Sequence, residues 1–395
     1  MNDIIQTLTQ KHDAPFFFYD LDGLDRHLKE IKSILHPEVK VWYACKANPL
    51  SNILRVLNEN GFGVDVASLG ELTQAQAAGL KPHALIATGP AKSKKYLSKM
   101  MDAQVSTIVI ESINQLKDLN EVAGSRGLKQ NVLLRVQLAW DESLKSVLGG
   151  SSITPFGLGV EDWKKVNLSE YAHLEVLGLH CFQWGNILDL SKFATIWENT
   201  ISQCVSLAQY LKIDMKVLDL GGGLGVNYQE GTELTFNEVH SLLLTLKEKY
   251  QLKEIWLELG RFTVANFGSY LTPIIDIKDV RGKKLMVTEG GINHIARPAL
   301  VNEAFPCSTL SLSKEATETF SVHGPLCTAL DFLGDHKLPR NTQVGDWLHF
   351  KKVGAYGFTE SMPYFLCHDL PGEICLYKGD IIQSRTSVTS ASWLS

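Results

Sequence analysis

A lysine, a glycine triplet and a glutamate lie in this chain at points where all three could belong to one catalytic site. Lys46 closes the apolar, β-prone run 41–46 and is followed at once by the turn residues Asn48 and Pro49. An amine at a strand end is partly removed from water, which lowers its pKa and lets it form a Schiff base with a carbonyl compound. The alternative is a lysine whose side chain reaches solvent from the strand end. The residues farther along the chain favour the catalytic interpretation.

The glycines 221–223 follow one apolar run, and Glu258 stands near the end of the next. A glycine triplet after a strand lets backbone N–H groups converge on a phosphate, and Gly260 and Arg261 could complete such a site. The alternatives are an ordinary tight turn for the triplet and a rim ion pair for Glu258. An amine for an aldehyde, a phosphate cradle and a carboxylate for a pyridine nitrogen together fit pyridoxal 5′-phosphate (PLP).

Short apolar runs alternate with amphipathic stretches through the first two thirds of the chain. The runs span residues 39–46, 62–67, 84–88, 106–110, 131–137, 176–182, 216–220 and 255–259, and the stretches include 51–60, 69–79, 92–102, 113–124, 190–212 and 235–250. Strands that alternate with helices favour a parallel sheet, and eight such units predict an α/β fold with a closed (β/α)8 barrel. Functional groups collect at the carboxyl ends of barrel strands, so we expect Lys46, Asp65 and His180 near one rim. We expect His180 to be a catalytic residue, and the alternative is a purely structural neighbour of the site.

The pattern changes after about residue 262. The runs 271–278, 284–288, 346–350 and 373–377 are separated by turn residues and have no long amphipathic stretches between them, which predicts mostly antiparallel β-structure. We therefore expect a PLP-binding barrel at 22–262 and a C-terminal β domain at 263–395. The N-terminal segment 1–21, with its Phe-Phe-Phe-Tyr run, is expected to add a strand to the β domain.

Composition narrows the possible partners and compartments. The formal net charge of −5 over 395 residues gives no reason to expect nucleic acid or an anionic membrane. We see neither a signal-peptide pattern in the first residues nor an apolar run long enough to cross a bilayer. The seven cysteines have no paired or metal-like spacing, so we expect reduced thiols, no metal and a cytoplasmic location.

Seven ordered motifs resemble those of one enzyme family over roughly residues 15–380. They are Tyr-Ala-Cys-Lys-Ala-Asn-Pro (43–49), Gly-Val-Asp-Val-Ala-Ser (63–68), Gly-Leu-His-Cys (178–181), Leu-Asp-Leu-Gly-Gly-Gly (218–223), Glu-Leu-Gly-Arg (258–261), Gly-Pro-Leu-Cys (324–327) and Gly-Ala-Tyr-Gly (354–357). The chain is similar to the alanine-racemase-fold, PLP-dependent decarboxylases that include diaminopimelate, ornithine and lysine decarboxylases. The resemblance implies a homodimer in which each active site combines the barrel of one subunit with the Gly-Pro-Leu-Cys segment of the other.

The resemblance also assigns roles by matching position. Lys46 resembles the Schiff-base lysine, Glu258 the partner of the pyridine nitrogen, and Cys327 the partner subunit's cysteine that returns a proton after CO2 leaves. A packed core thiol is the alternative for Cys327. The implied cofactor contacts are Asp65, His180, Gly222, Gly223, Gly260, Arg261 and Tyr356, and the implied substrate contacts are Arg297, Thr328, Asp331 and Tyr364.

Three departures from the family pattern bear on the substrate. Thr328 stands where diaminopimelate and ornithine decarboxylases carry an acidic residue for the distal amine, Phe182 replaces the ring-stacking histidine, and Leu259 replaces a proline. The roles of Phe182 and of the neighbouring Gln183-Trp184 stay open. The changes are similar to a siderophore-biosynthesis branch, of the citryl-diaminopropionate type, that acts on amino acids with an acylated side-chain nitrogen. An amide carries no charge, so Thr328 would leave no ion unpaired.

We therefore expect a PLP-dependent amino-acid decarboxylase acting on an acylated diamino acid. The first alternative is simple diaminopimelate, lysine or ornithine decarboxylation. A racemase of the same fold is disfavoured because racemases place an arginine, not Glu258, at the pyridine nitrogen. A non-catalytic PLP-binding homologue is disfavoured because Lys46, Glu258, Gly222 and Cys327 are all intact.

Overall fold

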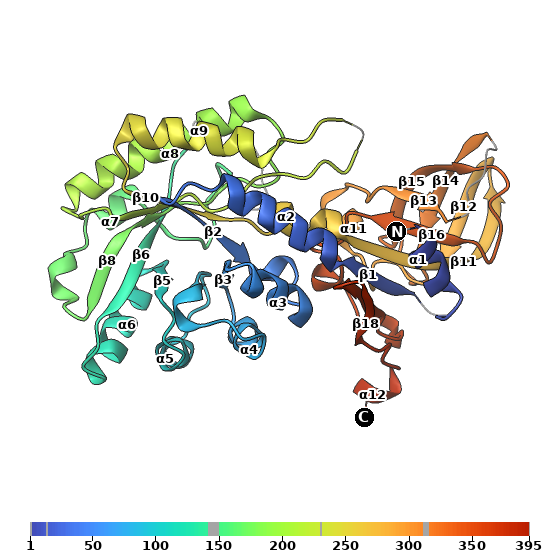
Figure 1. Cartoon of the computed structure of the whole chain (residues 1–395), viewed down its shortest axis with the longest axis horizontal. Coiled ribbons are helices and arrows are strands. Elements are labelled where there is room, and N and C mark those ends of the chain that lie inside the picture. Colours follow the sequence, from blue (N-terminus) through green and yellow to red (C-terminus); the bar gives the residue numbers. More distant parts are fainter. Residues whose placement is uncertain (1, 13–14, 141–149, 230, 311–315, 395) are drawn as a thin grey trace. The chain divides into compact units, whose positions relative to one another are not determined.

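The computed structural model describes residues 2–12, 15–140, 150–229, 231–310 and 316–394, and the chain divides into two compact units (Figure 1). The barrel unit comprises His27–Val226 and Thr232–Phe262. The β unit comprises Met1–Arg26, Asn227–Gly231 and Thr263–Ser395.

Eight parallel strands close the barrel, as the sequence predicts. In barrel order they are β2 (Val39–Ala44), β3 (Gly63–Val66), β4 (Leu85–Ala87), β5 (Thr107–Ile110), β6 (Gln130–Gln137), β8 (Leu174–His180), β9 (Val217–Asp219) and β10 (Glu254–Glu258). The pairing of β10 with β2 and of β5 with β6 completes the ring. A short strand, β7 (Leu158–Gly159), adds to β6.

Helices cover the outside of the barrel (Figure 1). They are α3 (Ser51–Glu59), α4 (Leu69–Ala77), α5 (Lys94–Asp102), α6 (Ile113–Ser125), α7 (Val160–Trp163), α8 (Leu190–Tyr210) and α9 (Phe236–Tyr250). Ser68, Ser93 and Ser112 each cap one of these helices by accepting a bond from a backbone N–H three residues later. Such caps satisfy donors that a helix start leaves unpaired, so the strand-to-helix turns are encoded locally.

The barrel interior is layered, and its lower layer is apolar. Side chains from six strands meet there: Trp42, Ile86, Val109, Leu133, Val217 and Trp256. Because side chains alternate between the two faces of a strand, the positions two residues further on point into the same interior. Those positions are Ala44, Thr88, Glu111, Arg135, Asp219 and Glu258. The sequence thus changes from an apolar layer to a polar layer toward the carboxyl ends of the strands.

A mostly antiparallel sheet forms the β unit. Its strand order is β15 (Phe332–Pro339), β14 (Thr317–His323), β12 (Lys283–Thr288), β11 (Gly268–Val280), β1 (Phe16–Asp20), β17 (Gly372–Tyr377) and β18 (Asp380–Arg385), and β16 (Trp347–Lys351) joins β11 to β13 (Cys307–Thr309). The N-terminal strand β1 pairs antiparallel with β11 and parallel with β17. Phe16 and Phe18 of β1 pack with Leu271 and Ile374 in a shared core.

The remaining helices are α1 (Asn2–Thr9), α2 (Leu21–Ile34), α10 (Arg261–Val264), α11 (Arg297–Val301) and α12 (Ala391–Leu394). No helix among the described residues is long and apolar enough to cross a membrane.

Candidate active site

Lys46 lies just after the end of its strand, whereas the sequence predicts it as the last residue of the strand. Strand β2 ends at Ala44, and Lys46 is the middle residue of the short 3-10 helix Cys45–Ala47 that follows. The turn is closed by a hydrogen bond from the Asn48 amide to the Cys45 carbonyl oxygen. The Lys46 Nζ atom is 5.9 Å from the centre of the Phe182 ring. The amine therefore lies at the carboxyl end of the barrel beside an apolar ring.

The glycine triplet after β9 packs too closely for side chains. A Cβ atom on Gly222 would come within 2.3 Å of the Glu258 carbonyl oxygen, and one on Gly221 within 2.3 Å of the Phe182 ring. Gly221 and Gly223 also have positive φ angles of 64° and 102°, which favour glycine. The residues that the sequence assigns to the phosphate thus form a bare stretch of backbone at the end of β9. Gly260 is buried at the end of β10, and Arg261 follows it as the first residue of α10.

Glu258 is buried in a cluster with His180 and Asp219. His180 Nε2 lies 3.1 Å from Glu258 Oε1, and one ligating atom of each of the three residues lies within 4.8 Å of the others. Burial raises the pKa of Glu258, while the Lys46 ammonium opposes that rise. Burial also holds the pKa of His180 well below its usual value, so the imidazole is neutral at physiological pH.

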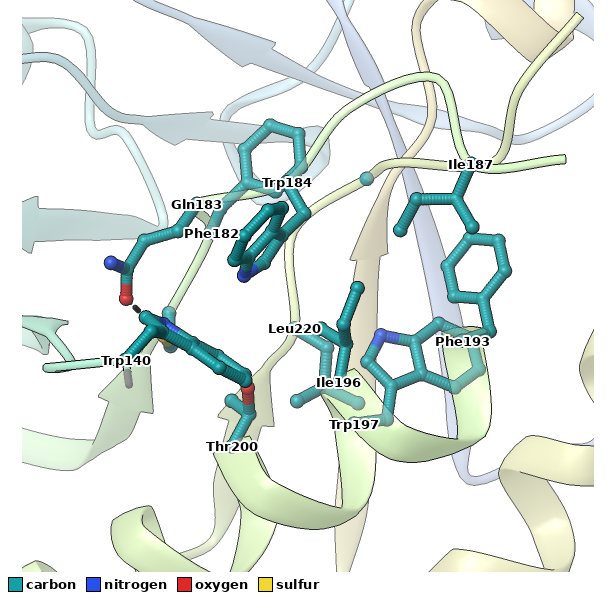
Figure 2. A pocket seen from close by; sticks show the side chains of 12 residues that line it. Trp140, Phe182, Gln183, Trp184, Ile187, Phe193, Ile196, Trp197, Thr200 and Leu220 are labelled. Atoms are coloured by element: carbon teal, nitrogen blue, oxygen red, sulfur yellow. Dashed lines mark hydrogen bonds between the residues drawn. The ribbon is translucent and has the colours of Figure 1, made fainter. Parts of the chain in front are cut away.

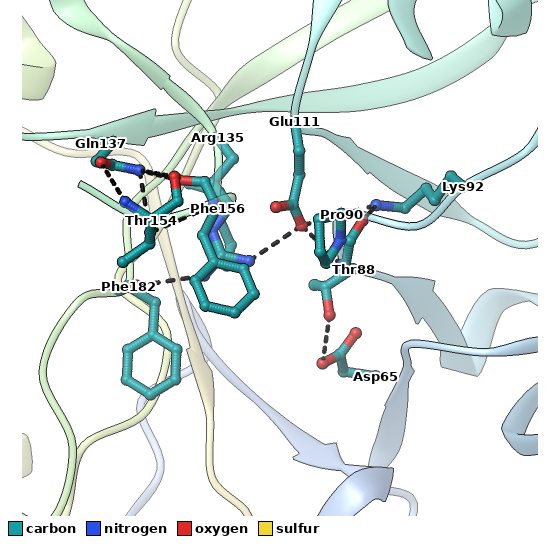
Figure 3. Close-up of polar contacts among 12 residues, drawn as sticks. Asp65, Thr88, Pro90, Lys92, Glu111, Arg135, Gln137, Thr154, Phe156 and Phe182 are labelled. Carbon is teal, nitrogen blue, oxygen red and sulfur yellow. Dashed lines mark hydrogen bonds and ion pairs between the residues drawn. The ribbon is translucent and has the colours of Figure 1, made fainter. Parts of the chain in front are cut away.

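Asp65 lies on β3 in the same polar layer. Burial and the nearby negative charge of Glu258 raise the pKa of Asp65 to about 8, and the Lys46 ammonium acts in the opposite direction. Thr88 donates a 2.9 Å hydrogen bond to Asp65 Oδ2 (Figure 3). The structure therefore brings the predicted barrel residues Lys46, Asp65, His180 and Glu258 close enough to influence one another electrostatically.

A buried ion network lies in the same polar layer, and it was not predicted from the sequence (Figure 3). Glu111 Oε1 accepts bonds from the Gly89 amide at 2.7 Å and from Arg135 at 3.0 Å, and Lys92 Nζ lies 3.8 Å away. Arg135 also donates a 3.2 Å bond to the Phe182 carbonyl oxygen. Burial lowers the pKa of Lys92 to about 8. The charged residue Arg135 inside the apolar run 131–137 is the feature of the sequence that could have indicated this network.

The segment that departs from the family pattern is tightly packed (Figure 2). Gln183 donates to the carbonyl oxygens of Leu138 and Gly150, both at 3.0 Å, and accepts from the Leu138 amide at 2.8 Å. Trp184 contacts Trp140 edge-to-face at 5.4 Å. Phe182 and Trp184 line a small pocket together with Ile187, Phe193, Ile196, Trp197 and Leu220, among others. Gln183 and Trp184 are thus structural, and Phe182 alone of the three lies beside Lys46.

The predicted residues of the Gly-Pro-Leu-Cys segment differ from one another in exposure. Cys327 is exposed, and Thr328 is half-buried with its hydroxyl oxygen accepting a 3.2 Å bond from the Leu330 amide. Asp331 is 1% exposed, and its carboxylate accepts bonds from the amides of Ile292 at 2.8 Å and Leu326 at 2.7 Å. Asp331 therefore holds two backbone segments together, and its contact with substrate stays a prediction.

Three further predicted residues lie elsewhere in the β unit. Arg297 is 5% exposed, forms a 2.6 Å ion pair with Glu303 and stacks on Tyr228. Tyr364 is 59% exposed, and Tyr356 has a positive φ of 55°. The buried ion pair already satisfies part of the Arg297 guanidinium, so its predicted substrate contact stays a prediction. The predicted substrate contact of Tyr364 and the predicted cofactor contact of Tyr356 also stay predictions.

The barrel residues fit PLP. The bare glycine backbone has the shape that a phosphate group needs, because any side chain there would collide with Glu258 or Phe182. Lys46 offers an amine for the aldehyde, and Glu258 offers a buried carboxyl group for the ring nitrogen. The flat ring of Phe182 lies close to the triplet and to Lys46.

Comparisons with known proteins agree with this assignment. Residues 21–265 match the family model described as "Pyridoxal-dependent decarboxylase, pyridoxal binding domain". Diaminopimelate decarboxylase of Aquifex aeolicus is 30% identical over 91% of this chain and 86% of that protein. The enzyme named 2-[(L-alanin-3-ylcarbamoyl)methyl]-2-hydroxybutanedioate decarboxylase, of Staphylococcus aureus, is 29% identical over 94% of this chain and 96% of that protein.

A solved structure shows the same likeness. Diaminopimelate decarboxylase from Helicobacter pylori, complexed with L-lysine, matches with a TM-score of 0.89 at 26% identity and covers 98% of both chains. The whole architecture is shared, from the closed barrel to the antiparallel sheet. The chain belongs to the pyridoxal-dependent decarboxylase family and is a carboxy-lyase that uses PLP as its cofactor.

Proposed function

We propose that this decarboxylase acts on an amino acid whose side-chain nitrogen is acylated, in the assembly of a siderophore. The observation that carries the proposal is the uncharged Thr328 at the position after Cys327. A substrate with a distal ammonium group needs an anionic partner in a site that excludes water. An acylated nitrogen has no charge, and a threonine hydroxyl can bond to an amide.

The neighbouring acid does not replace the missing carboxylate. Asp331 is three residues away, but its two carboxylate oxygens already accept bonds from the Ile292 and Leu326 amides. Its side chain is buried, and burial raises its pKa. A distal ammonium would therefore have to draw Asp331 away from two backbone donors that hold the segment in shape.

The name of the S. aureus relative describes a substrate of the proposed kind. It specifies an alanine whose C3 atom carries an amide nitrogen, joined through the amide to a hydroxybutanedioate. Such a molecule keeps the α-amino and α-carboxyl groups that decarboxylation needs, and its side-chain nitrogen is neutral. We propose a substrate of this class for the present enzyme.

The positions of the barrel residues support a role for each of them. When bound, PLP supplies an electron sink for the electron pair that remains on the substrate after CO2 leaves. Lys46 would hold the aldehyde through its amine. Glu258 would accept a hydrogen bond from the ring nitrogen and keep it protonated, while Gly222, Gly223, Gly260 and Arg261 would hold the phosphate.

We further propose a homodimer in which Cys327 serves the partner's barrel. Cys327 is exposed in the single chain, so its thiol is available to a second subunit. There it would deliver a proton to the substrate's Cα atom. No disulfide joins the seven cysteines, which supports a cytoplasmic location.

Diaminopimelate decarboxylation is a second candidate because relatives with that name, including the one from A. aeolicus, are about as similar as the S. aureus enzyme. The deciding experiment is CO2 release by PLP-loaded enzyme. The acylated compound named for the S. aureus enzyme would be offered beside diaminopimelate, lysine and ornithine. We expect the acylated compound to have the highest kcat/KM. A preference for any free diamino acid would refute the proposed substrate class and leave the family assignment intact.

A further inference from the structure

His180, Asp219 and Glu258 come from three neighbouring strands of the barrel, and sheet geometry brings them together. His180 pairs with Asp219 across β8 and β9, and Asp219 pairs with Trp256 across β9 and β10. Glu258 follows Trp256 by two residues and so points to the same side. All three side chains are at most 3% exposed. The cluster therefore lies in the polar layer with almost no access to bulk water.

Hydrogen bonding in the cluster is asymmetric. Asp219 accepts a 2.8 Å bond from the Gly221 amide through Oδ1, and its side chain is also hydrogen-bonded to that of Glu258. His180 contacts Glu258 through Nε2, while no described group bonds to its Nδ1 atom. A buried Nδ1 lone pair without a hydrogen-bond partner costs less free energy than a buried N–H group without one. Buried donors without a partner are rarer in proteins and more destabilising than buried acceptors without one. The favoured tautomer therefore carries its proton on Nε2 and donates it to Glu258.

Two buried carboxyl groups this close share protons unequally. Burial is the main cause that raises the pKa of both Asp219 and Glu258, and the negative charge of Glu258 raises that of Asp219 further. Glu258 also receives the favourable influence of the cations Lys46 and Arg135. Other charged or titratable groups that act in this layer are Asp65, Lys92 and Glu111. The hydrogen bond between the two side chains acts in the same sense, because it raises the pKa of Asp219 and lowers that of Glu258.

The geometry points to His180 and Asp219 as positioning residues that jointly keep Glu258 an anion: His180 donates through Nε2, and Asp219 is a carboxylic acid that holds the proton Glu258 would otherwise take. The inference deepens the proposed role of Glu258 at the ring nitrogen and rests on it. An anionic Glu258 holds a proton on that nitrogen, whereas a protonated Glu258 would not. The strength of the electron sink is thereby set by two residues that need not touch the cofactor.

The first test uses the protein without its cofactor and is independent of the proposed substrate. Infrared difference spectra at neutral pH report the C=O stretch of protonated carboxyl groups. We expect the Asp219→Asn variant to lose one such band and the Glu258→Gln variant to lose carboxylate absorption. Asp65→Asn serves as the reference because Asp65 is another acid with a raised pKa in the same buried layer. Loss of a protonated band in Glu258→Gln, with none lost in Asp219→Asn, would overturn the proposal.

The second test measures the ring nitrogen directly, with 15N-labelled PLP bound to the enzyme. In His180→Phe we expect the 15N shift to move toward that of an unprotonated pyridine and kcat to fall about 10- to 100-fold at similar KM. His180→Gln places an amide donor at the same reach and should restore the shift of the parent enzyme. An unchanged shift in His180→Phe would reduce His180 to a packing residue. If stoichiometric zinc bound the apoprotein and His180→Phe abolished that binding, the cluster would be a metal site and the proposal would be wrong.

Discussion

The barrel unit and the β unit differ in how they present their predicted functional residues. In the barrel, Asp65, His180 and Glu258 are at most 3% exposed and are surrounded by charged and polar partners. The β unit is mixed, because Cys327 and Tyr364 are exposed whereas Asp331 and Arg297 are buried. A single chain thus contains a preorganised cofactor layer together with reactive groups that face solvent.

This contrast is informative because buried and exposed side chains suit different tasks. Cofactor electronics depend on fixed charges in a water-poor environment, which burial provides. A group that serves a second subunit must remain accessible until the subunits associate. The following variants test whether the two regions differ in function as they differ in burial.

Replacement of Lys46 is expected to have the largest effect. Lys46→Ala removes the amine that anchors the aldehyde, so the visible absorbance of the holoenzyme should disappear and kcat should fall on the order of 10³-fold or more. Absorbance spectra and CO2 release measure this. Lys40→Ala, on the same strand but with an exposed side chain, is the matched control and should keep both properties. A Lys46→Ala enzyme with its visible band intact would contradict the assignment.

Cys327→Ala should have a smaller effect that leaves the cofactor in place. Loss of the thiol removes the proposed proton donor, so kcat should fall on the order of 10²-fold with the visible spectrum retained. Product analysis in D2O should show altered deuterium incorporation at Cα. Cys367→Ala replaces another exposed cysteine of the same unit and should behave as the parent enzyme. Equal turnover in the two variants would assign Cys327 a structural role.

Thr328→Glu should change specificity more than rate. A carboxylate after Cys327 supplies the missing partner for a distal ammonium, so kcat/KM for lysine or diaminopimelate relative to the acylated compound should rise about tenfold. Thr328→Gln is the neutral control of similar size and should not produce this change. If both variants shifted the ratio equally, size and not charge would decide specificity.

The smallest effect concerns acid stability of the β unit. Burial lowers the pKa of His294 to about 4, and its ring bonds to the Tyr270 hydroxyl at 2.8 Å and the Asp369 carbonyl oxygen at 3.0 Å. The unfolded chain binds this proton near pH 6.5, so stability from the neutral ring is present above that pH and is lost as the pH falls toward 4. The loss approaches about 3 kcal/mol.

Denaturant unfolding of the full-length protein at several pH values measures this slope. His294→Gln should flatten it between pH 6.5 and 4, whereas the exposed His83→Gln should not. An unchanged slope in His294→Gln would mean that other groups, such as His349, determine acid stability.

Much of the barrel could be predicted because its elements are encoded locally. The alternation of apolar runs and amphipathic stretches placed all eight strands to within two residues, and Ser68, Ser93 and Ser112 mark the helix starts. The placement of Lys46 on the strand itself was less accurate, because a 3-10 turn depends on the closing bond at Asn48 and not on hydrophobic pattern.

The ion network of Lys92, Glu111 and Arg135 could not be predicted in the same way. These residues lie on separate βα units, and the pairing of β4 with β5 and of β5 with β6 brings them together. The burial of Asp331 could not be predicted for a similar reason. The backbone amides of Ile292 and Leu326, which bond to its carboxylate, are brought to it by the fold of the β unit.

The eight βα units of the barrel and the candidate cofactor residues could be predicted from the sequence, since periodicity and motifs are properties of contiguous segments. Which charged side chains lie close together depends on the tertiary structure. Register between strands places a polar layer two residues above an apolar one, and burial in that layer shifts the pKa values of Asp65, His180, Asp219 and Glu258. Protonation depends on distance and on exclusion of water, and neither quantity can be obtained from spacing along the chain.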